Sequence, residues 1–421
     1  MLTREDNELL TRIGRGTPMG EMIRRHWVPA CLSEELPAPD CDPLRVRLLG
    51  EDLVAFRDTS GRVGLMDEHC PHRGASLFFG RNEEGGLRCL YHGWKMDADG
   101  TVLDTPCEPF TRRLRHEAYP VHEQGEVVWA YLGPREKMPP FPNFGWTQVP
   151  AERRCVGKVN YACNYLQAIE GAIDSSHADL LHSGYEVLHW SEEEIRAVEP
   201  GRSQYARRRW EAEDTPYGFR YAAIREGSGH DAETVKSVRV TCFALPFHCL
   251  LPDVPHMFVP ADDEMTWFYD VRTGERAIDR AASLAQRGEA VGVDVTPDRH
   301  KVRTLQNNYL QDRAAMRARE EKWSYSGIGW GKPHQDMAVI ESMGAVYDRT
   351  KEHLGIQDVG VVRMRERMLT AVRHFMETGE VAELDASIPY DRIAGELRII
   401  PVDTPWQTVA DYRKESVPAA R

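Results

Sequence analysis

Hydrophobic and polar positions divide the chain into a short helical start, a run of short strands, and a longer region that mixes strands with helices. Apolar residues recur at helical spacing within residues 3–13 and again near residues 19–27, with a glycine-containing break between them. Thr3 fits the N-cap of the first helix, because its hydroxyl can accept a hydrogen bond from the backbone of the first turn. Residues 1–40 are therefore expected to form a helical N-terminal segment.

The pattern changes to short β segments between residues 41 and 135. Apolar runs or alternating apolar and polar residues occupy segments 45–49, 53–57 and 125–131, and turn residues separate the first two of them. Short antiparallel strands of this kind can present loops from their ends. We expect residues 41–135 to form a separate β domain.

A proline-rich stretch follows this β domain. Pro139, Pro140, Pro142 and Pro150 lie close together, and proline at this density resists both helices and central strands. Residues 136–150 are therefore expected to be a linker.

The remaining residues, 151–421, show both strand and helix patterns. Strand-like runs occur at 219–224, 238–243 and 265–270, whereas helical periodicity marks 336–354 and 358–378. The expected fold class is α+β, with an antiparallel sheet and several helices in this second domain.

Composition and charge narrow the class of protein. The 421 residues are 41% hydrophobic and carry a net charge of −13, which disfavours nucleic-acid binding. No apolar run approaches the ~20 residues of a membrane span. The start of the chain lacks a basic region followed by an apolar one, so a cytoplasmic location is the expectation.

Two cysteine–histidine loops mark the expected β domain. Cys70 and His72 form a Cys-x-His loop, sixteen residues separate His72 from Cys89, and Cys89 and His92 form a Cys-x-x-His loop. These ligands suit a tetrahedral zinc ion or a [2Fe–2S] cluster with cysteines on one iron and histidines on the other. Zinc fingers usually offer paired cysteines and then paired histidines. The spacing therefore favours the iron–sulfur cluster, with zinc as the alternative.

The two loops resemble the Rieske motif of ring-hydroxylating oxygenases, and the similarity extends along nearly the whole chain. It is closest to the phthalate 4,5-dioxygenase-like branch. The resemblance implies an N-terminal antiparallel β domain in which Cys70, His72, Cys89 and His92 hold a Rieske [2Fe–2S] cluster. It also implies a C-terminal helix-grip (START-like) antiparallel sheet, whose helices hold a mononuclear non-haem iron.

A second constellation reads Asp-x-x-His-x₄-His, with Asp174, His177 and His182. On a helix Asp174 and His177 would share a face, whereas His182 would point about 140° away from His177. The helix is therefore expected to bend or end near residues 180–181. Two imidazoles and a carboxylate form the facial triad of non-haem Fe(II) sites, although an isolated histidine pair is more often an ordinary surface or core feature.

The resemblance assigns roles within this constellation. It implies that His177 and His182 bind the iron and that Asp174 bridges towards a cluster histidine of a neighbouring subunit. Asp336 is the third iron ligand by the same resemblance, with Glu341 as the rival. Five residues beyond Asp336, Glu341 would face a different direction on a helix.

Arginines in the expected strands are weaker candidates for binding substrate carboxylates through bidentate hydrogen bonds. Such residues more often form solvated strand faces. The candidates are Arg207, Arg208, Arg209, Arg220, Arg225 and Arg239.

The resemblance implies the terminal oxygenase component of a multicomponent system. Such a component uses O₂ and NAD(P)H-derived electrons from a separate flavin- or ferredoxin-type reductase to hydroxylate an aromatic compound, here expected to be an aromatic carboxylate. It also implies a homotrimer or a dimer of trimers. The alternatives are an O-demethylase or monooxygenase of a methoxylated aromatic acid and, less well supported, a Rieske electron carrier. The long C-terminal region, with its own His/Asp set, argues against a carrier.

Overall fold

The computed structural model describes residues 2–106, 114–182, 207–226, 234–252, 254–318, 325–329 and 332–413. Residues 12–142 and 259–263 form one compact unit, and the rest of the chain forms a second. We call these the N-terminal and the C-terminal unit. The expected segment 1–40 is divided between the two units, because its first helix belongs to the C-terminal unit.

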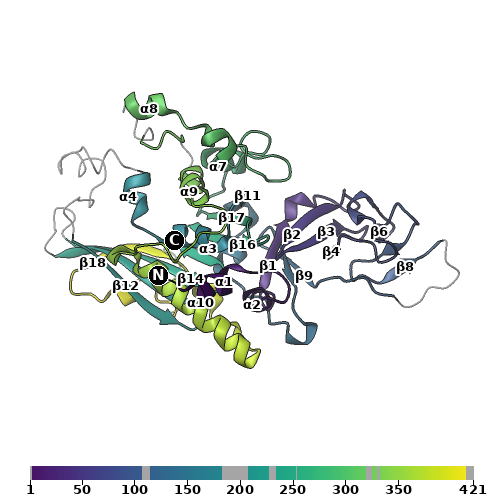
Figure 1. Cartoon of the computed structure of the whole chain (residues 1–421), viewed down its shortest axis with the longest axis horizontal. Coiled ribbons are helices and arrows are strands. Elements are labelled where there is room, and N and C mark those ends of the chain that lie inside the picture. Colours follow the sequence, from purple (N-terminus) through teal and green to yellow (C-terminus); the bar gives the residue numbers. More distant parts are fainter. Residues whose placement is uncertain are drawn as a thin grey trace. The chain divides into compact units, whose positions relative to one another are not determined.

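The N-terminal unit is built from three small antiparallel sheets, with strand orders β1-β10-β9, β2-β3-β4 and β5-β6-β7-β8. Figure 1 shows these short strands in purple and blue. One helix, α2 (Pro18–Ile23), precedes them. The strands are β1 (Trp27–Leu32), β2 (Leu44–Leu48), β3 (Glu51–Arg57), β4 (Val63–Asp67), β5 (Arg81–Glu83), β6 (Gly86–Arg88), β7 (Lys95–Met96), β8 (Val102–Asp104), β9 (Val121–Gln124) and β10 (Val127–Tyr131).

Two-residue turns fix the register of three hairpins in this unit. Leu49 and Gly50 join β2 to β3 with φ of 50° and 79°, and Glu84 and Gly85 join β5 to β6 with φ of 50° and 78°. The turn between β9 and β10 has the same positive-φ signature. Positive φ at both central residues gives a turn whose twist matches the flanking strands.

The C-terminal unit contains an eight-stranded sheet among its described residues, with order β11-β17-β16-β15-β14-β13-β12 and β18 paired with β14. Every neighbouring pair whose register is defined is antiparallel. The strands are β11 (Arg154–Tyr161), β12 (Arg207–Thr215), β13 (Gly218–Glu226), β14 (Val235–Ala244), β15 (His248–Leu251), β16 (Val254–Pro260), β17 (Thr266–Thr273) and β18 (Glu396–Pro401).

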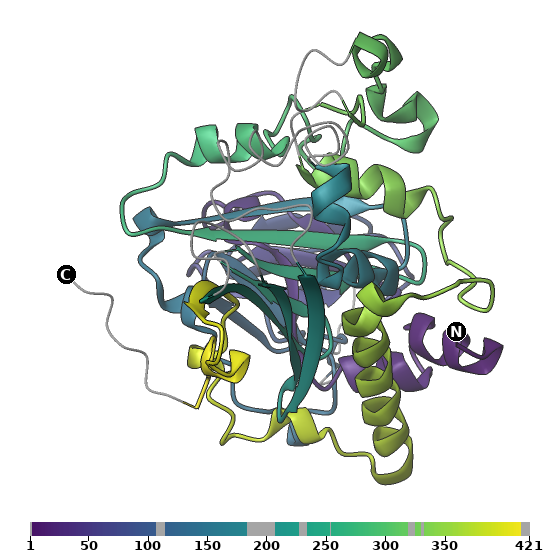
Figure 2. The same ribbon diagram turned by 90° about the vertical axis from the view of Figure 1, so that its left-hand side faces the viewer.

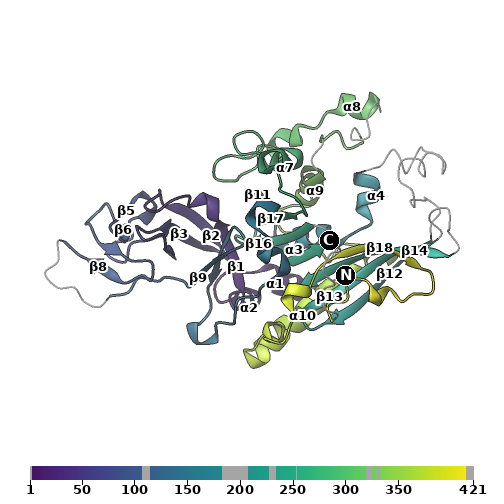
Figure 3. The same cartoon turned by 180° about the vertical axis from the view of Figure 1, so that it is seen from behind.

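Helices cover this sheet. The longest, α10, packs against β12 and β13, and Figure 2 shows it beside the curved sheet. Figures 1 and 3 place α4 and α9 on the same side of the sheet. The helices are α1 (Arg4–Thr11), α3 (Tyr165–Ile173), α4 (His177–Leu181), α7 (Arg280–Arg287), α8 (Arg313–Ala318), α9 (Lys332–Glu341) and α10 (Val359–Thr378). The expected α+β fold, with antiparallel sheets in both parts of the chain, is confirmed.

Two expected helices differ from the observed ones. The helix expected at 19–27 ends at Ile23, because Trp27 already begins β1. The helix expected at 336–354 is shorter as well, since α9 ends at Glu341 and Gly344 adopts a φ of 96° soon afterwards. In the part of the chain that the structure describes, no helix is long and apolar enough to cross a bilayer.

A buried ion network fixes α3 to the C-terminal part of the unit. Glu170 on α3 accepts hydrogen bonds from Arg349 Nε at 2.7 Å and Nη2 at 2.9 Å. Arg365 on α10 donates from Nε to Glu170 at 2.6 Å and also pairs with Glu352. Although burial opposes ionisation, the two arginines lower the pKa of Glu170. The network therefore holds the helix that leads directly to His177.

We expect Arg365→Met to destabilise the C-terminal unit strongly. The substitution leaves Glu170 and Glu352 with fewer positive partners inside the protein, and breaking a buried ion pair costs roughly 3–5 kcal/mol. Urea unfolding of the variant and the wild type would measure the loss. Arg363→Met is the matched control, because Arg363 pairs with Asp214 and Glu366 at the exposed surface, where an ion pair contributes about 0–1 kcal/mol. Equal losses in the two variants would contradict a structural role for the buried network.

Candidate functional site

The two cysteine–histidine loops of the N-terminal unit share one backbone geometry. The Gly74 N–H donates to the Cys70 carbonyl at 2.8 Å, and the Gly93 N–H donates to the Cys89 carbonyl at 3.0 Å. Both glycines have a left-handed conformation, with φ of 73° and 75°, which a side chain would strain. Each loop is therefore a tight turn that carries one cysteine and one histidine.

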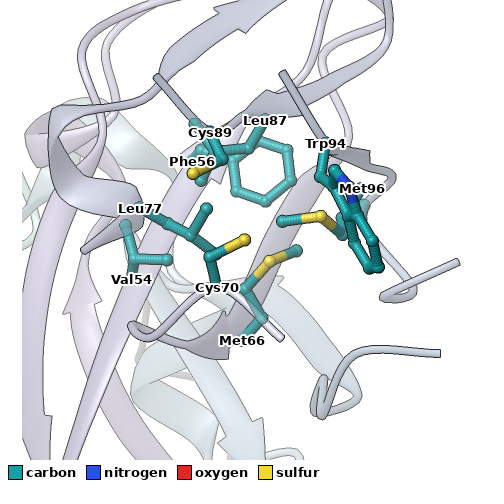
Figure 4. Close-up of a cluster of buried hydrophobic side chains, with 10 residues drawn as sticks. Val54, Phe56, Met66, Cys70, Leu77, Leu87, Cys89, Trp94 and Met96 are labelled. Carbon is teal, nitrogen blue, oxygen red and sulfur yellow. The ribbon is translucent and has the colours of Figure 1, made fainter. Parts of the chain in front are cut away.

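The two loops bring their ligand-type side chains together. The His72 and His92 rings lie 4.5 Å apart between centroids, and the His72 ring stacks on Trp94 at 4.8 Å and 6°. Cys70 and Cys89 are almost fully buried, at 4% and 3% exposure. Figure 4 shows the two cysteines within the same apolar cluster as Trp94, which also contains Val54, Phe56, Met66, Leu77, Leu87 and Met96.

The residues of these loops fit a bound iron–sulfur cluster. The Nδ1 atom of His72 is buried and has no hydrogen-bond partner, as expected for an atom that serves as a metal ligand. Burial, together with the neighbouring Cys89 thiol, raises the pKa of Cys70 to about 11. A metal centre would supply the positive charge that the Cys70 thiol needs to ionise.

The second constellation lies in the C-terminal unit, where three ligand-type side chains come from two distant segments. His177 begins α4, His182 follows its last residue, and Asp336 lies on α9. One nitrogen of each histidine and one oxygen of Asp336 all lie within 4.8 Å of one another. The structure therefore brings together the three residues that the family resemblance implies as iron ligands.

The distances between these groups are short. His182 Nε2 lies 3.2 Å from Asp336 Oδ1, and His177 Nε2 lies 3.4 Å from the same oxygen. That oxygen is buried and makes no hydrogen bond, which marks a donor atom available to a cation. The set of two imidazoles and one carboxylate is the facial triad of non-haem iron sites.

The charges of the three residues depend on one another. Burial disfavours a charged His177, but Asp174 and Asp336 outweigh it and raise the pKa of His177 to about 10. Burial likewise opposes ionisation of Asp336, yet the two imidazoles hold its pKa well below the usual range. Without a metal ion, a proton on an imidazole thus balances the carboxylate, and a metal cation would replace that proton.

Two further side chains orient the histidines. Gln335 Oε1 lies 2.7 Å from His182 Nδ1, while Gln335 Nε2 donates to the Gly329 carbonyl at 2.9 Å. Asp174 Oδ2 lies 3.3 Å from His177 Nδ1. Both contacts leave the Nε2 atoms directed at Asp336, as the partners of metal-bound histidines usually do. The sequence did not predict Gln335 as a partner of His182. Its place directly before Asp336 is the feature that could have identified it.

The prediction that one helix contains both Asp174 and His177 is wrong, because α3 ends at Ile173 and α4 begins at His177. Asp174 caps the end of α3, and its carboxylate accepts hydrogen bonds from the backbone and hydroxyl of Ser176 at 2.7 and 2.6 Å. The chain turns here because an aspartate side chain can satisfy backbone donors just beyond a helix. The second helix then ends at Leu181, where the sequence predicted a break.

The rival carboxylate Glu341 has a structural role. Its Oε1 lies 2.7 Å from Lys301 Nζ and accepts the Ala162 N–H at 2.8 Å. Both Glu341 and Lys301 are 1% exposed. Glu341 therefore ties the end of α9 to the sheet and does not point at the histidines.

The triad lines a cavity of about 740 Å³ within the C-terminal unit. Apolar side chains such as Leu251, Phe258 and Phe268 form part of its wall, and Arg239 and His256 add polar groups from the sheet. A cavity of this volume accommodates a small organic molecule, with a few polar groups to orient it. A substrate held here would lie beside the candidate iron ligands.

The arginine candidates separate into different roles. Arg220 is fully buried and bonds to Glu213 and to backbone carbonyls, whereas Arg209 pairs with Glu211 and Glu226. Arg225 does not line the cavity, but Arg239 does. The side chains of Arg207 and Arg208 lie outside the described part of the chain.

Comparison with protein families matches both parts of the chain. Residues 26–120 match the Rieske [2Fe-2S] domain, and residues 130–420 match the family described as LigXa C-terminal domain like. The phthalate 4,5-dioxygenase oxygenase subunit of Pseudomonas putida is 40% identical over 99% of this chain and 96% of its own length. The 5,5'-dehydrodivanillate O-demethylase oxygenase subunit of a Sphingobium species is 32% identical over 88% of this chain and 80% of its own length.

A solved structure supports the fold. Dicamba monooxygenase bound to dicamba aligns with a TM-score of 0.56 and 19% identity, covering 85% of this chain and 99% of that one. The family matches, together with the His177, His182 and Asp336 triad, confirm the expected Rieske cluster and mononuclear iron as cofactors. The chain belongs to the Rieske non-haem iron oxygenases, as an oxygenase subunit similar to that of phthalate 4,5-dioxygenase.

Proposed function

We propose that this chain is the terminal oxygenase component of a system that hydroxylates an aromatic carboxylate with O₂. A separate flavin- or ferredoxin-type reductase would deliver the electrons from NAD(P)H. The observation that carries the proposal is the cavity whose wall contains both the His177, His182 and Asp336 triad and Arg239. The wall of this cavity therefore contains both a candidate site for O₂ chemistry and a cationic side chain, Arg239, that can bind a carboxylate.

The two units hold different cofactors. We assign the cluster to Cys70, His72, Cys89 and His92, and the mononuclear iron to the triad. When bound, the cluster and the iron supply electron transfer and O₂ activation. The protein contributes fixed ligand geometry: Gln335 and Asp174 hold the imidazoles, and the apolar cavity wall limits the access of water to the substrate.

Asp174 is assigned a second role in electron transfer. Its contact with His177 Nδ1 leaves a carboxylate that is 23% exposed and adjoins the cavity. A carboxylate between two metal-bound histidines can orient both by accepting their outer N–H groups. We propose that Asp174 accepts from a cluster histidine of a neighbouring subunit, in a homotrimer or a dimer of trimers. Because the electron source is NAD(P)H, we place this assembly in the cytoplasm.

Arg239 is the group assigned to the substrate carboxylate. It projects from β14 into the cavity wall, and its one hydrogen bond among the described residues runs from Nη1 to the Thr241 hydroxyl at 3.2 Å. No described carboxylate forms an ion pair with Arg239. A guanidinium in this state can bind a carboxylate through two parallel hydrogen bonds.

O-demethylation of a methoxylated aromatic acid is the second candidate function. The similarity to the dehydrodivanillate O-demethylase subunit favours it, since the same iron triad can serve either reaction. Hydroxylation of a methyl ether gives a hemiacetal that collapses to a phenol and formaldehyde. Formaldehyde therefore distinguishes the two reactions.

The metal assignments predict that the mononuclear iron and the cluster can be lost separately. His182→Ala should lower the iron content from about three to about two per chain while the visible spectrum of the cluster persists, because only the mononuclear site loses a ligand. Cys89→Ser should abolish that spectrum. Iron analysis and absorption spectroscopy of the purified variants check both outcomes. A His182→Ala protein that keeps its third iron would contradict the assignment.

Asp174→Asn should keep both metals and lower the rate of substrate oxidation about 10- to 100-fold, the usual range for partners of metal-bound histidines. The asparagine can still accept from Ser176, so the local turn should survive. Oxygen uptake with a surrogate reductase, alongside iron content, measures the effect. Asp385→Asn, a change of the same type at an exposed position, is the control. Full activity of Asp174→Asn would exclude the bridging role.

Arg239→Gln should raise the KM for an aromatic carboxylate about 10- to 100-fold, since one charged hydrogen-bonding partner is lost. Product analysis by mass spectrometry and a formaldehyde assay, with benzoates and methoxybenzoates as test substrates, would identify the reaction. Arg209→Gln provides the control outside the cavity. If wild-type protein oxidised none of these acids, the proposed substrate class would be wrong; an unchanged KM in Arg239→Gln would exclude Arg239 as the anchor.

A further inference from the structure

The indole of Trp94 connects the two cysteine–histidine loops of the N-terminal unit. The backbone carbonyl of Trp94 accepts a hydrogen bond from the Cys89 N–H at 2.8 Å. Its ring lies parallel to the His72 ring, with 4.8 Å between the centroids and 6° between the planes. Trp94 is therefore held by the backbone of one loop while its side chain stacks on the histidine of the other.

The two loops differ at the position of this tryptophan. In the first loop the Cys70 N–H donates to the Ala75 carbonyl at 2.9 Å, just as the Cys89 N–H donates to the Trp94 carbonyl in the second loop. Ala75 is thus the counterpart of Trp94 in an equivalent turn. Because the first loop forms this turn with an alanine, the turn itself does not require an indole.

The indole N–H of Trp94 is buried and has no hydrogen-bond partner in the part of the chain that the structure describes. Trp94 as a whole is 8% exposed. Nearly all buried donors in proteins have a partner, and an unpaired one calls for an explanation such as a bound group. Trp94 shares its apolar surroundings with Cys70 and Cys89 (Figure 4), so sulfur acceptors belong to the same pocket.

The surroundings make a single donor important. The described side chains packed with Trp94 and the two cysteines carry no N–H or O–H group; they are Val54, Phe56, Met66, Leu77, Leu87, Met96 and Ala98. Reduction of an iron–sulfur cluster adds a negative charge, which an apolar environment disfavours. Hydrogen bonds to the sulfur atoms offset this cost and raise the reduction potential.

We propose that Trp94 Nε1 donates a hydrogen bond to a sulfur of the bound cluster or of its cysteine ligands and thereby raises the reduction potential of the cluster. The donor makes the cluster a better acceptor of electrons from the reductase. This inference goes beyond the proposed function, because it concerns the electron affinity of the cluster and not the substrate. It rests on the assignment of the cluster to Cys70, His72, Cys89 and His92.

Trp94→Phe tests the proposal, because phenylalanine keeps an aromatic ring and removes the donor. The equilibrium constant for one-electron reduction of the cluster should fall about tenfold, the usual effect of a hydrogen bond to a charged group. This change corresponds to a midpoint potential lower by about 59 mV. A redox titration of the full chain with both metals, followed by the electron paramagnetic resonance signal of the reduced cluster, measures the shift.

Two control variants separate the donor from packing. Met96→Leu alters the same apolar cluster without touching a donor. Trp129→Phe makes the same substitution elsewhere in the N-terminal unit, where the indole Nε1 already donates to the Gln124 carbonyl at 3.0 Å. Both controls should keep the potential of the wild type.

A second measurement detects the hydrogen bond without relying on a variant. Wild-type protein with nitrogen-15 in its tryptophan indoles would be reduced and studied by pulsed electron paramagnetic resonance. The bond predicts a hyperfine coupling between the reduced cluster and an indole nitrogen. Trp94→Phe protein with the same label should lack this coupling. If Trp94→Phe does not retain the cluster, the coupling in the wild type decides.

The possible results distinguish this inference from the proposed function. An unchanged potential in Trp94→Phe with an intact cluster spectrum, or no indole coupling in the wild type, would overturn the hydrogen bond. An equal fall of the potential in Met96→Leu would also overturn it, since packing would then explain the shift. If Cys89→Ser retained the cluster, the ligand assignment would fail instead. Oxidation of aromatic acids is measured separately and does not depend on these results.

Discussion

The C-terminal unit depends on holding the carboxylate of Asp336, whose Oδ1 atom is buried, between two imidazoles. Asp336 comes from a helix far along the chain from His177 and His182, and 153 positions separate His182 from Gln335, the residue before Asp336. The three side chains converge only if α3, α4 and α9 keep their relative positions to within about 0.5 Å. Contacts elsewhere in the unit hold these three helices in place.

Three buried polar contacts provide this fixation. Glu170, paired with Arg349 and Arg365, holds α3. Glu341, paired with Lys301, holds the end of α9. Gln335 connects α9 directly to His182. Each contact joins residues that are distant in sequence, and each is shielded from water, so removing one partner leaves an uncompensated polar group in the interior.

The expected cluster ligands can be recognised in the sequence because their chemistry imposes short spacings. A two-iron cluster needs two short loops with one thiolate and one imidazole each, and the pairs of Cys70 with His72 and Cys89 with His92 meet that need within a few residues. The turn residues of the β hairpins and the glycine after α10 are local signals of the same kind. The α+β class and most strands follow from such local patterns.

What the sequence did not predict arises from contacts between distant segments. Asp174 was expected on a helix, but its side chain satisfies the backbone of Ser176 and ends that helix. Arg220 and Arg239 look alike as strand arginines, and only the folded sheet buries the first against Glu213 and opens the second to the cavity. The contacts of Asp270 with His256 and Arg287 likewise depend on β16, β17 and α7 meeting in space.

This chain is proposed to hold both the cluster that receives electrons and the iron site at which O₂ reacts with the substrate. The most direct measurement is a single turnover without reductase: protein reduced chemically, mixed anaerobically with an aromatic acid, then exposed to O₂. We predict oxidised product in an amount up to about one per chain, formed as the cluster is reoxidised. Reoxidation of the cluster without any product, in protein that holds both metals and binds the acid, would contradict the claim.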